Sequence, residues 1–257
     1  MALGFIVSPA KKMNVVEGPP YPVGTPQLLQ RTEVLLDTLR QLSYEQVRDL
    51  WKCSDRLAQL NYERLQGADL THGLTAACLA YEGIQYQHLA PQVASDDVLA
   101  YLDAHLRILS GFYGVVRPSD GVVPYRLEMQ AKLTVPAHEN LPATHDLYSF
   151  WGADLARILA DEFDCVVNVA SVEYAKAVTP YLATWGTPMV TCLFGTVRPS
   201  DGKLIQRSTE AKAARGTFVR WCAENSVDDP EGLVGFSHGS QQHQCLSARF
   251  PEGSFNF

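Results

Sequence analysis

Tyr125, Arg126 and Glu128 form a compact group of side chains that can bind charge and move protons. They follow the apolar segment Leu109–Gly114, whose two glycines indicate tight turns or the close approach of another group. Because Arg126 and Glu128 stand two residues apart, a strand would direct both side chains to the same side. Arg126 would then hold an anionic ligand while Glu128 orients that ligand or accepts a proton from it. The alternative is a buried ion pair that only stabilises the fold.

Polar side chains also follow or lie within apolar runs in three other segments. They are Ser8 and Lys11; Asn168, Ser171, Glu173 and Tyr174; and Lys212 and Arg215. The carboxyl ends of strands in α/β proteins often carry ligand contacts, and Lys212 and Arg215 lie three apart on one helix face. Gly216 in that helix indicates that another group packs closely against its backbone. Together with Arg126, the three basic residues of these segments would form a positive pocket that suits phosphate. The alternative is a scatter of surface charges and salt bridges.

The same residues suit an enzyme that acts on a small phosphorylated or nucleobase-like molecule. Glu128 or Glu173 would be the acid or base, with Tyr125 as a further catalytic group. The anion would be bound by Lys11, Arg126 and Lys212, and the polar pocket would comprise Ser8, Asn168, Ser171 and Tyr174. The sequence contains no Walker A loop, dinucleotide-binding glycine motif, serine-hydrolase elbow or zinc-protease motif. We therefore predict no bound cofactor.

The composition limits the class of partner. The chain has 257 residues, of which 46% are hydrophobic and 19% charged, the balance of a globular protein with a substantial core. The formal net charge is -7, so any contact with nucleic acid must rest on a local basic patch. The six cysteines include no C-x-x-C pair, and no apolar stretch is long enough to span a membrane. The sequence predicts a cytoplasmic protein with no metal site and no membrane contact, and a monomer because no apolar stripe demands a partner.

Hydrophobic patterning predicts a mixed α/β fold, a mixed sheet surrounded by helices. Apolar runs bounded by turn residues predict buried strands at Leu3–Val7 and Cys165–Ala170. Helices are predicted after Pro26 and at Asp96–Leu106, Tyr148–Phe163 and Glu210–Asn225, and a hairpin is predicted between Met189–Phe194 and Lys203–Gln206. No linker divides the chain, so residues 1–257 are predicted to form a single domain, with an irregular tail after about residue 237.

Two short helices joined by a tight turn are predicted near residues 43–65. Ser43 and Gln46 have the spacing of a capping box, and Ser54 can cap the second helix. Such a helix-hairpin-helix-like unit can present backbone amides to nucleic-acid phosphates, and Lys52 and Arg56 would add positive charge. The alternative is a plain packing hairpin, since the turn lacks glycine and nearby aspartates cancel its charge.

Six segments of the chain resemble, in order, those of the YaaA peroxide-stress protein family. They are SPAK (Ser8–Lys11), LRILSGFYGVVRP (Leu106–Pro118), PYRLEM (Pro124–Met129), LYSFWG (Leu147–Gly152), NVASVEY (Asn168–Tyr174) and AKAARG (Ala211–Gly216). Each segment alone is weak, but their joint occurrence from near the N-terminus to about Gly235 is specific.

The resemblance implies a cytosolic bacterial protein linked to peroxide stress and to limiting free intracellular iron. It also implies a single mixed α/β domain that binds double-stranded DNA through a helix-hairpin-helix unit and a positive cleft. By position, the unit would be Ser43–Leu65, with its turn at Lys52–Asp55. The cleft would draw on Lys11, Arg126, Lys212 and Arg215. The acidic overall charge and the nearly neutral hairpin depart from a favourable DNA binder.

Overall fold

A five-stranded mixed sheet forms the centre of the computed structural model, which describes residues 2–16, 24–139, 141–198, 200–201 and 203–236 and the backbone of 248–249 and 254–255. In spatial order its strands are β6 (Gly114–Val116), β5 (Leu106–Ser110), β1 (Leu3–Val7), β8 (Cys165–Asn168) and β9 (Met189–Thr191). β5, β1, β8 and β9 run parallel, and β6 is antiparallel to β5. Every residue of β1 is buried, as expected for a strand with covered faces. The prediction of a mixed α/β single domain is confirmed.

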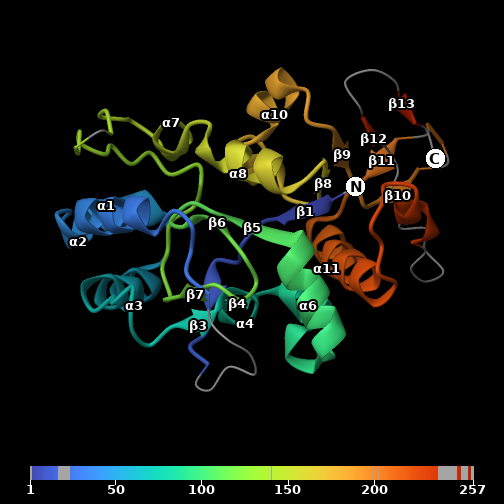
Figure 1. Ribbon diagram of the computed structural model, residues 1–257. Helices are drawn as coiled ribbons and strands as arrows, with labels where there is room; N and C mark the ends of the chain where they lie inside the picture. Colours follow the sequence, from blue (N-terminus) through green and yellow to red (C-terminus); the bar gives the residue numbers. More distant parts are fainter. Residues whose placement is uncertain are drawn as a thin grey trace.

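Helices cover both faces of this sheet (Figure 1). One face is covered by α8 (Asp154–Glu162) and α10 (Thr179–Trp185), and the other by α6 (Asp96–His105) and α11 (Ser208–Glu224). α11 also packs tightly against α5 (Ile84–Leu89), because a Cβ atom at Gly216 would overlap with the carbonyl oxygen of Gln85. This contact confirms the close packing predicted for Gly216.

Three helices, α1 (Leu29–Arg40), α2 (Tyr44–Trp51) and α3 (Asp55–Gln66), lie together beside the β6 edge of the sheet (Figure 1). The Ser43 capping box is confirmed: Ser43 Oγ accepts a hydrogen bond from Gln46 N, and Gln46 Oε1 accepts one from Ser43 N. Ser54 occupies the N-cap position of α3, as predicted, but its side chain makes no cap hydrogen bond. Lys52 ends α2 in the left-handed conformation, at φ 45°. The assignment of α2 and α3 as a DNA-binding helix-hairpin-helix unit stays a prediction.

The structure corrects two sequence-based boundaries. The predicted Tyr148–Phe163 helix is divided into α7 (Leu147–Trp151) and α8, because Gly152 takes a positive φ of 52° and breaks the helical backbone. β9 does not form the predicted hairpin; it pairs in parallel with β8, which buries Val190. The hairpin of this region is instead formed by β10 (Thr196–Val197) and β11 (Leu204–Ile205).

Short elements connect these layers. They are β2 (Lys12–Met13) paired with β4 (Tyr81–Glu82), β3 (Thr75–Ala76) paired with β7 (Gly121–Val122), α4 (Ala77–Ala80), α9 (Val172–Ala175), and the 3-10 helices Pro91–Val93 and Gly232–Gly235. Most of the tail predicted to be irregular lies outside the described residues; Ala248–Arg249 (β12) and Ser254–Phe255 (β13) pair antiparallel.

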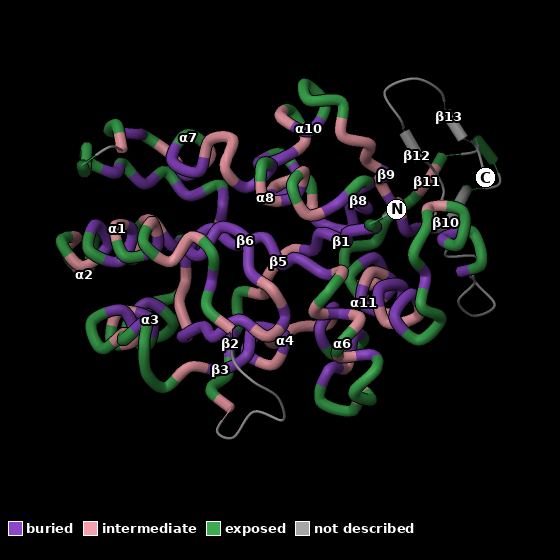
Figure 2. The backbone as a smooth tube through the Cα atoms, in the orientation of Figure 1, coloured by how far each residue is buried: buried purple, intermediate pink, exposed green. Residues whose placement is uncertain are grey.

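The core runs along the sheet and continues under the flanking helices (Figure 2). Its largest fully buried side chains include Trp151, Tyr113, Phe5, Phe112 and Phe218. Within the described residues, no helix has both the length and the apolar character needed to cross a membrane.

Candidate functional site

The carboxyl ends of β1 and β8 bring two of the predicted segments together. Ser8 follows β1 and Ser171 follows β8; Ser171 N donates to Ser8 Oγ at 2.9 Å, and the two hydroxyls lie 3.1 Å apart. From the central β1 the chain proceeds to β5 on one side and later to β8 on the other. Such a reversal of strand order is where open α/β sheets bind ligands. Lys11 follows β1 and Glu173 follows β8, so both lie at the edge of the sheet where such folds bind ligands.

Gly111 positions the segment that carries Arg126 and Glu128. A Cβ atom at Gly111 would lie 2.6 Å from the carbonyl oxygen of Leu127, so only glycine lets this backbone approach the end of β5. Trp151 Nε1 fixes the same turn by donating to the carbonyl oxygen of Gly111 at 3.1 Å. The close approach predicted for this glycine-containing segment is confirmed.

Glu128 is an ion-pair centre in the floor of the site. Its Oε2 lies 2.8 Å from Lys11 Nζ, and its Oε1 lies 3.8 Å from Arg126 Nη2. Arg126 and Glu128 thus point to the same side, as their spacing predicted, although their segment is not a regular strand. Only 10% of the Arg126 side chain and 20% of the Glu128 side chain are exposed, so this ion pair is shielded from solvent.

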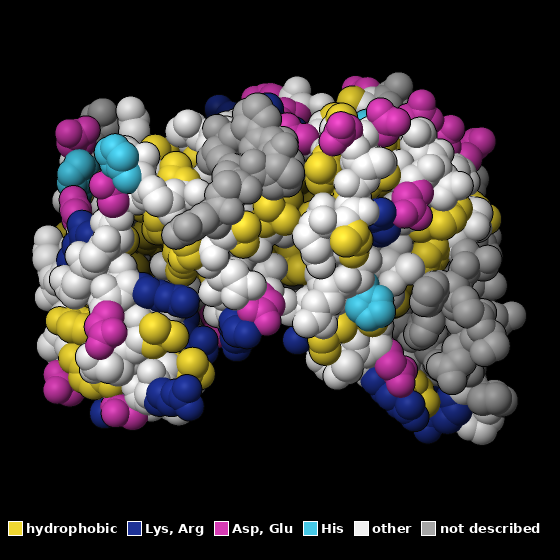
Figure 3. Space-filling view, turned by 90° about the horizontal axis from the view of Figure 1, so that it is seen from below, with side chains coloured by type: hydrophobic (Ala, Val, Ile, Leu, Met, Phe, Trp, Pro, Cys, Tyr) yellow, Lys and Arg dark blue, Asp and Glu magenta, His cyan; other side chains and the backbone are white. Residues whose placement is uncertain are grey.

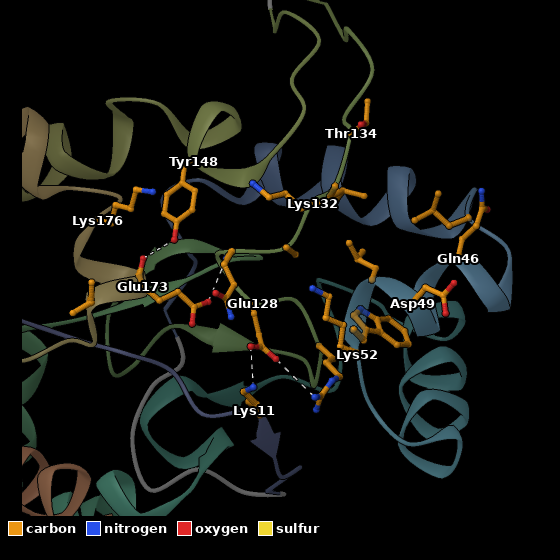
Figure 4. A pocket seen from close by; sticks show the side chains of 18 residues that line it. Lys11, Gln46, Asp49, Lys52, Glu128, Lys132, Thr134, Tyr148, Glu173 and Lys176 are labelled. Carbon is orange, nitrogen blue, oxygen red and sulfur yellow. Dashed lines mark hydrogen bonds and ion pairs between the residues drawn. The ribbon is translucent and has the colours of Figure 1, made fainter. Parts of the chain in front are cut away.

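Glu173, on α9, is a second carboxyl group in the same space (Figure 4). Burial raises the pKa of Glu173, and the negative charge of Glu128 acts in the same direction. The backbone N–H of Gln130, which donates to Glu173 Oε1 at 3.2 Å, and the charge of Lys11 oppose that rise in pKa. Tyr148 holds the start of α9 by donating to the backbone carbonyl oxygen of Glu173 at 2.9 Å. Glu173 therefore holds a proton more readily than an ordinary glutamate, a property that suits acid–base work.

Two adjoining cavities meet at these glutamates. A cavity of about 530 Å³ extends from them toward α11, and we call it the α11 arm. A cavity of about 1110 Å³ extends toward α2, and we call it the α2 arm. Both are lined by Lys11, Arg126, Glu128 and Glu173, so they form one continuous cleft. Figure 3 shows the hollow, with Lys and Arg side chains gathered on both sides of it.

Basic side chains outnumber acidic ones in this cleft. The basic lining residues are Lys11, Lys12, Lys52, Arg126, Lys132, Lys176, Lys212 and Arg215, and the acidic ones are Asp49, Glu82, Glu128 and Glu173. The cleft is thus net positive in a chain whose formal net charge is -7. The four basic residues predicted to converge, Lys11, Arg126, Lys212 and Arg215, all line the α11 arm, as do Ser8, Ser171 and Tyr174.

Other predicted residues lie apart from the cleft or are already engaged. Asn168 lines neither cavity; its side chain accepts from Ala170 N at 3.0 Å and donates to Thr191 Oγ1. Arg56 is exposed on α3 and also lines neither cavity. Tyr125 lines the α11 arm, but its hydroxyl lies 2.6 Å from that of Ser110, and burial raises the pKa of Tyr125 to about 12. Tyr125 therefore remains a neutral hydrogen-bonding group.

Sequence reasoning missed two lysines of the α2 arm, Lys132 and Lys176. Lys176 lies three residues after Glu173 in the same helical segment, a spacing that can be read from sequence, and its Nζ lies 5.0 Å from the centre of the Tyr148 ring. Lys132 lies in an irregular segment with no such signal. Among the described parts of the chain, no group of three or more His, Cys, Asp or Glu side chains is arranged to hold a metal ion.

Comparison with known proteins agrees with the resemblance drawn from the six segments. A family model described as peroxide stress protein YaaA matches residues 3–243. A UPF0246 protein of Pediococcus pentosaceus is 50% identical over 232 residues, which cover 90% of this chain and 89% of the relative. A UPF0246 protein of Lactiplantibacillus plantarum is 46% identical over 239 residues, covering 93% and 92%. One of Desulfitobacterium hafniense is 46% identical over 244 residues, covering 95% and 94%. The chain belongs to the YaaA family of peroxide stress proteins.

Proposed function

We propose that this protein serves the peroxide-stress response by binding double-stranded DNA along its basic cleft. The observation that carries the proposal is the net positive lining of one continuous cleft in an otherwise acidic chain. A local patch of this kind supplies the sequence-independent contacts that proteins make with the phosphate backbone.

The α2 arm offers the lysines best placed for such contacts. Lys52, Lys132 and Lys176 are exposed, and within the described residues none of them has a carboxylate within 4.0 Å. Figure 4 shows Lys52 approaching the arm from the α2 side, with Lys132 and Lys176 across from it. Exposed ammonium groups without a carboxylate partner, on facing walls, suit phosphates whose positions vary from one DNA sequence to another.

Salt titration of the unmodified protein tests the DNA proposal. We expect the logarithm of the association constant for a short duplex to fall linearly with the logarithm of salt concentration. The slope should be about -3 or steeper, because each neutralised phosphate contributes roughly -0.9. Fluorescence anisotropy with a labelled duplex measures this slope. An association constant that stays the same from low to moderate salt, or no binding at low salt, contradicts the proposal.

A contribution to limiting free intracellular iron, which the family resemblance implied, is part of the same proposal. Cells that lack the gene should contain more chelatable iron after peroxide exposure than cells that carry it. Electron paramagnetic resonance of chelated iron in whole cells measures the difference. Equal iron signals in the two strains count against this part of the proposal, whatever the result with DNA.

A second candidate function is an enzyme that acts on a small phosphorylated or nucleobase-like ligand. The observation that favours it is the pair of glutamates with unlike environments at the junction of the two arms. Lys11 and Arg126 pair with Glu128, whereas burial and the charge of Glu128 raise the pKa of Glu173. In this function Glu173 or Glu128 moves a proton while the basic side chains bind an anion.

A further inference from the structure

Arg215 is a partly buried arginine for which the described residues supply no counter-ion. Its Nε atom has no contact with solvent and no hydrogen-bond partner, and among the described residues no carboxylate lies within 4.0 Å of its side chain. Burial alone lowers the pKa of Arg215, with no opposing charge. Partial desolvation of a charge that has no counter-ion lowers stability, and an anion bound beside it would offset that loss.

Three other shielded arginines of this fold each have a carboxylate partner, although the Nε atoms of Arg31 and Arg126 also lack a hydrogen-bond partner. Arg107, with 4% of its side chain exposed, lies 2.6 Å from Glu162 and donates to two backbone carbonyl oxygens. Arg31 pairs with Asp154, and Arg126 lies 3.8 Å from Glu128. Arg215 is the exception among these, and it lies at the wall of the α11 arm. An anionic ligand in that cavity would supply the counter-ion that the described residues do not.

The neighbours of Arg215 in the α11 arm define the chemistry of this ligand. Lys212 lies three residues earlier on α11, on the same face, is exposed, and has no carboxylate partner among the described residues. The hydroxyls of Ser8 and Ser171 line the same cavity at the ends of β1 and β8. A guanidinium, an ammonium and hydroxyls form a donor set suited to phosphate oxygens. Glu128, by contrast, is already neutralised by Lys11 and Arg126 and does not compete for Arg215.

We propose that Arg215 and Lys212 hold the phosphate of a small phosphate monoester whose organic part extends toward Glu128 and Glu173. The volume of about 530 Å³ is that of a small-molecule site, larger than phosphate alone requires. Ala10, Ile84 and Leu127 give the same cavity apolar wall for an organic group. This inference rests on the second candidate function, the small-ligand enzyme, and is independent of DNA binding at the α2 arm.

Isothermal titration of the full chain with adenosine monophosphate, inorganic phosphate and adenosine tests the subsite. We expect one site per chain that binds the monoester more tightly than it binds either part alone. Arg215→Gln should weaken monoester binding about ten-fold or more, the loss expected when a hydrogen bond to a charged group is removed. Arg157→Ala is the matched control, because Arg157 is exposed on α8 and lines neither cavity. The Arg157→Ala variant should bind the monoester as tightly as the unmodified protein does.

A second variant keeps the test valid if Arg215→Gln folds poorly. Arg215→Met removes the buried charge but keeps the length of the side chain, so its melting temperature without ligand should be no lower than that of the unmodified protein. The monoester should raise the melting temperature of the unmodified protein and leave that of Arg215→Met unchanged. Equal monoester binding by the unmodified and Arg215 variants, or no binding by the unmodified protein, overturns the proposal.

Duplex DNA titrated into the same variants separates the two phosphate sources. In one outcome, the unmodified protein does not bind the monoester and Arg215→Gln loses duplex binding. Arg215 then contacts the phosphodiester backbone of DNA, and the monoester subsite is overturned. In the opposite outcome, the protein binds the monoester through Arg215 but does not bind duplex DNA. This result supports the subsite and contradicts the proposed DNA binding. The two proposals therefore fail on different measurements.

Discussion

Replacing Lys52, Lys132 and Lys176 together by alanine is expected to weaken binding of duplex DNA by about two orders of magnitude at low salt. Each lysine that contacts a phosphate contributes to binding almost independently of DNA sequence, so the loss should be similar for unrelated duplexes. All three side chains are exposed and line the α2 arm, so their truncation removes charge without opening the core. Anisotropy titrations of two duplexes of different sequence measure the loss.

Controls for this variant are available on other surfaces. Arg157→Ala removes a positive charge from exposed α8, which lies outside both arms, and should change duplex affinity by less than about two-fold. Circular dichroism and the melting temperature check that the triple variant keeps the fold. A triple variant that binds duplex DNA as tightly as the unmodified protein would show that the α2 arm is not the binding surface.

Glu173→Gln is expected to strengthen anion binding at pH values above the pKa of Glu173 and to remove most of the pH dependence of that binding. The raised pKa of Glu173 means that this group stays neutral at pH values where an exposed glutamate is charged. As pH rises through that pKa, a negative charge appears where the two arms meet, so affinity for duplex DNA should fall. Glutamine cannot acquire this charge, and its advantage at high pH should be about ten-fold, typical of one close charge in a shielded site.

The same titration affects stability in a direction that can be checked separately. Between the pKa of Glu173 in the unfolded chain and its higher pKa in the folded protein, the folded state holds a proton that the unfolded state has released. The free energy of unfolding therefore falls as pH rises through this window, and Glu173→Gln should abolish that part of the fall. Urea denaturation at several pH values measures it.

Asp161→Asn serves as the control for both readouts, because Asp161 is exposed on α8 and lines neither cavity. We expect this variant to keep the pH profile of the unmodified protein. If Glu173→Gln also keeps that profile, Glu173 does not titrate where the structure implies, and its assignment as the proton-holding group is wrong.

Local features of the site could be read from the sequence because they depend on near neighbours. The apolar runs of β1 and β8 are bounded by turn residues, and their polar ends predicted Ser8 and Ser171 as site residues. The Ser43 capping box and the close packing at Gly216 were likewise predicted from a few adjacent residues and are confirmed. The positive charge of basic residues in separate segments was enough to suggest that they share a pocket.

Features that depend on distant parts of the chain were not predicted correctly. β9 was assigned to a hairpin because its parallel pairing with β8 is set by the crossover through α9 and α10, which no local pattern reveals. Spacing placed Lys212 and Arg215 on one helix face, but only the packing of α11 shows that Arg215 is partly buried and Lys212 exposed. One local feature was also misjudged: Asn168 was predicted to contact a ligand, whereas its side-chain oxygen accepts a hydrogen bond from the backbone N–H of Ala170, a local contact that asparagine often makes.

The most direct test of the DNA-binding cleft is the difference in salt slope between the unmodified protein and the Lys52/Lys132/Lys176 alanine variant. Both are titrated with one duplex across the same salt series, with Arg157→Ala as reference. If these lysines neutralise phosphates, the slope of the triple variant is shallower by about three, and that of Arg157→Ala is unchanged. Equal slopes for the unmodified protein and the triple variant contradict the claim that the basic cleft binds the DNA backbone.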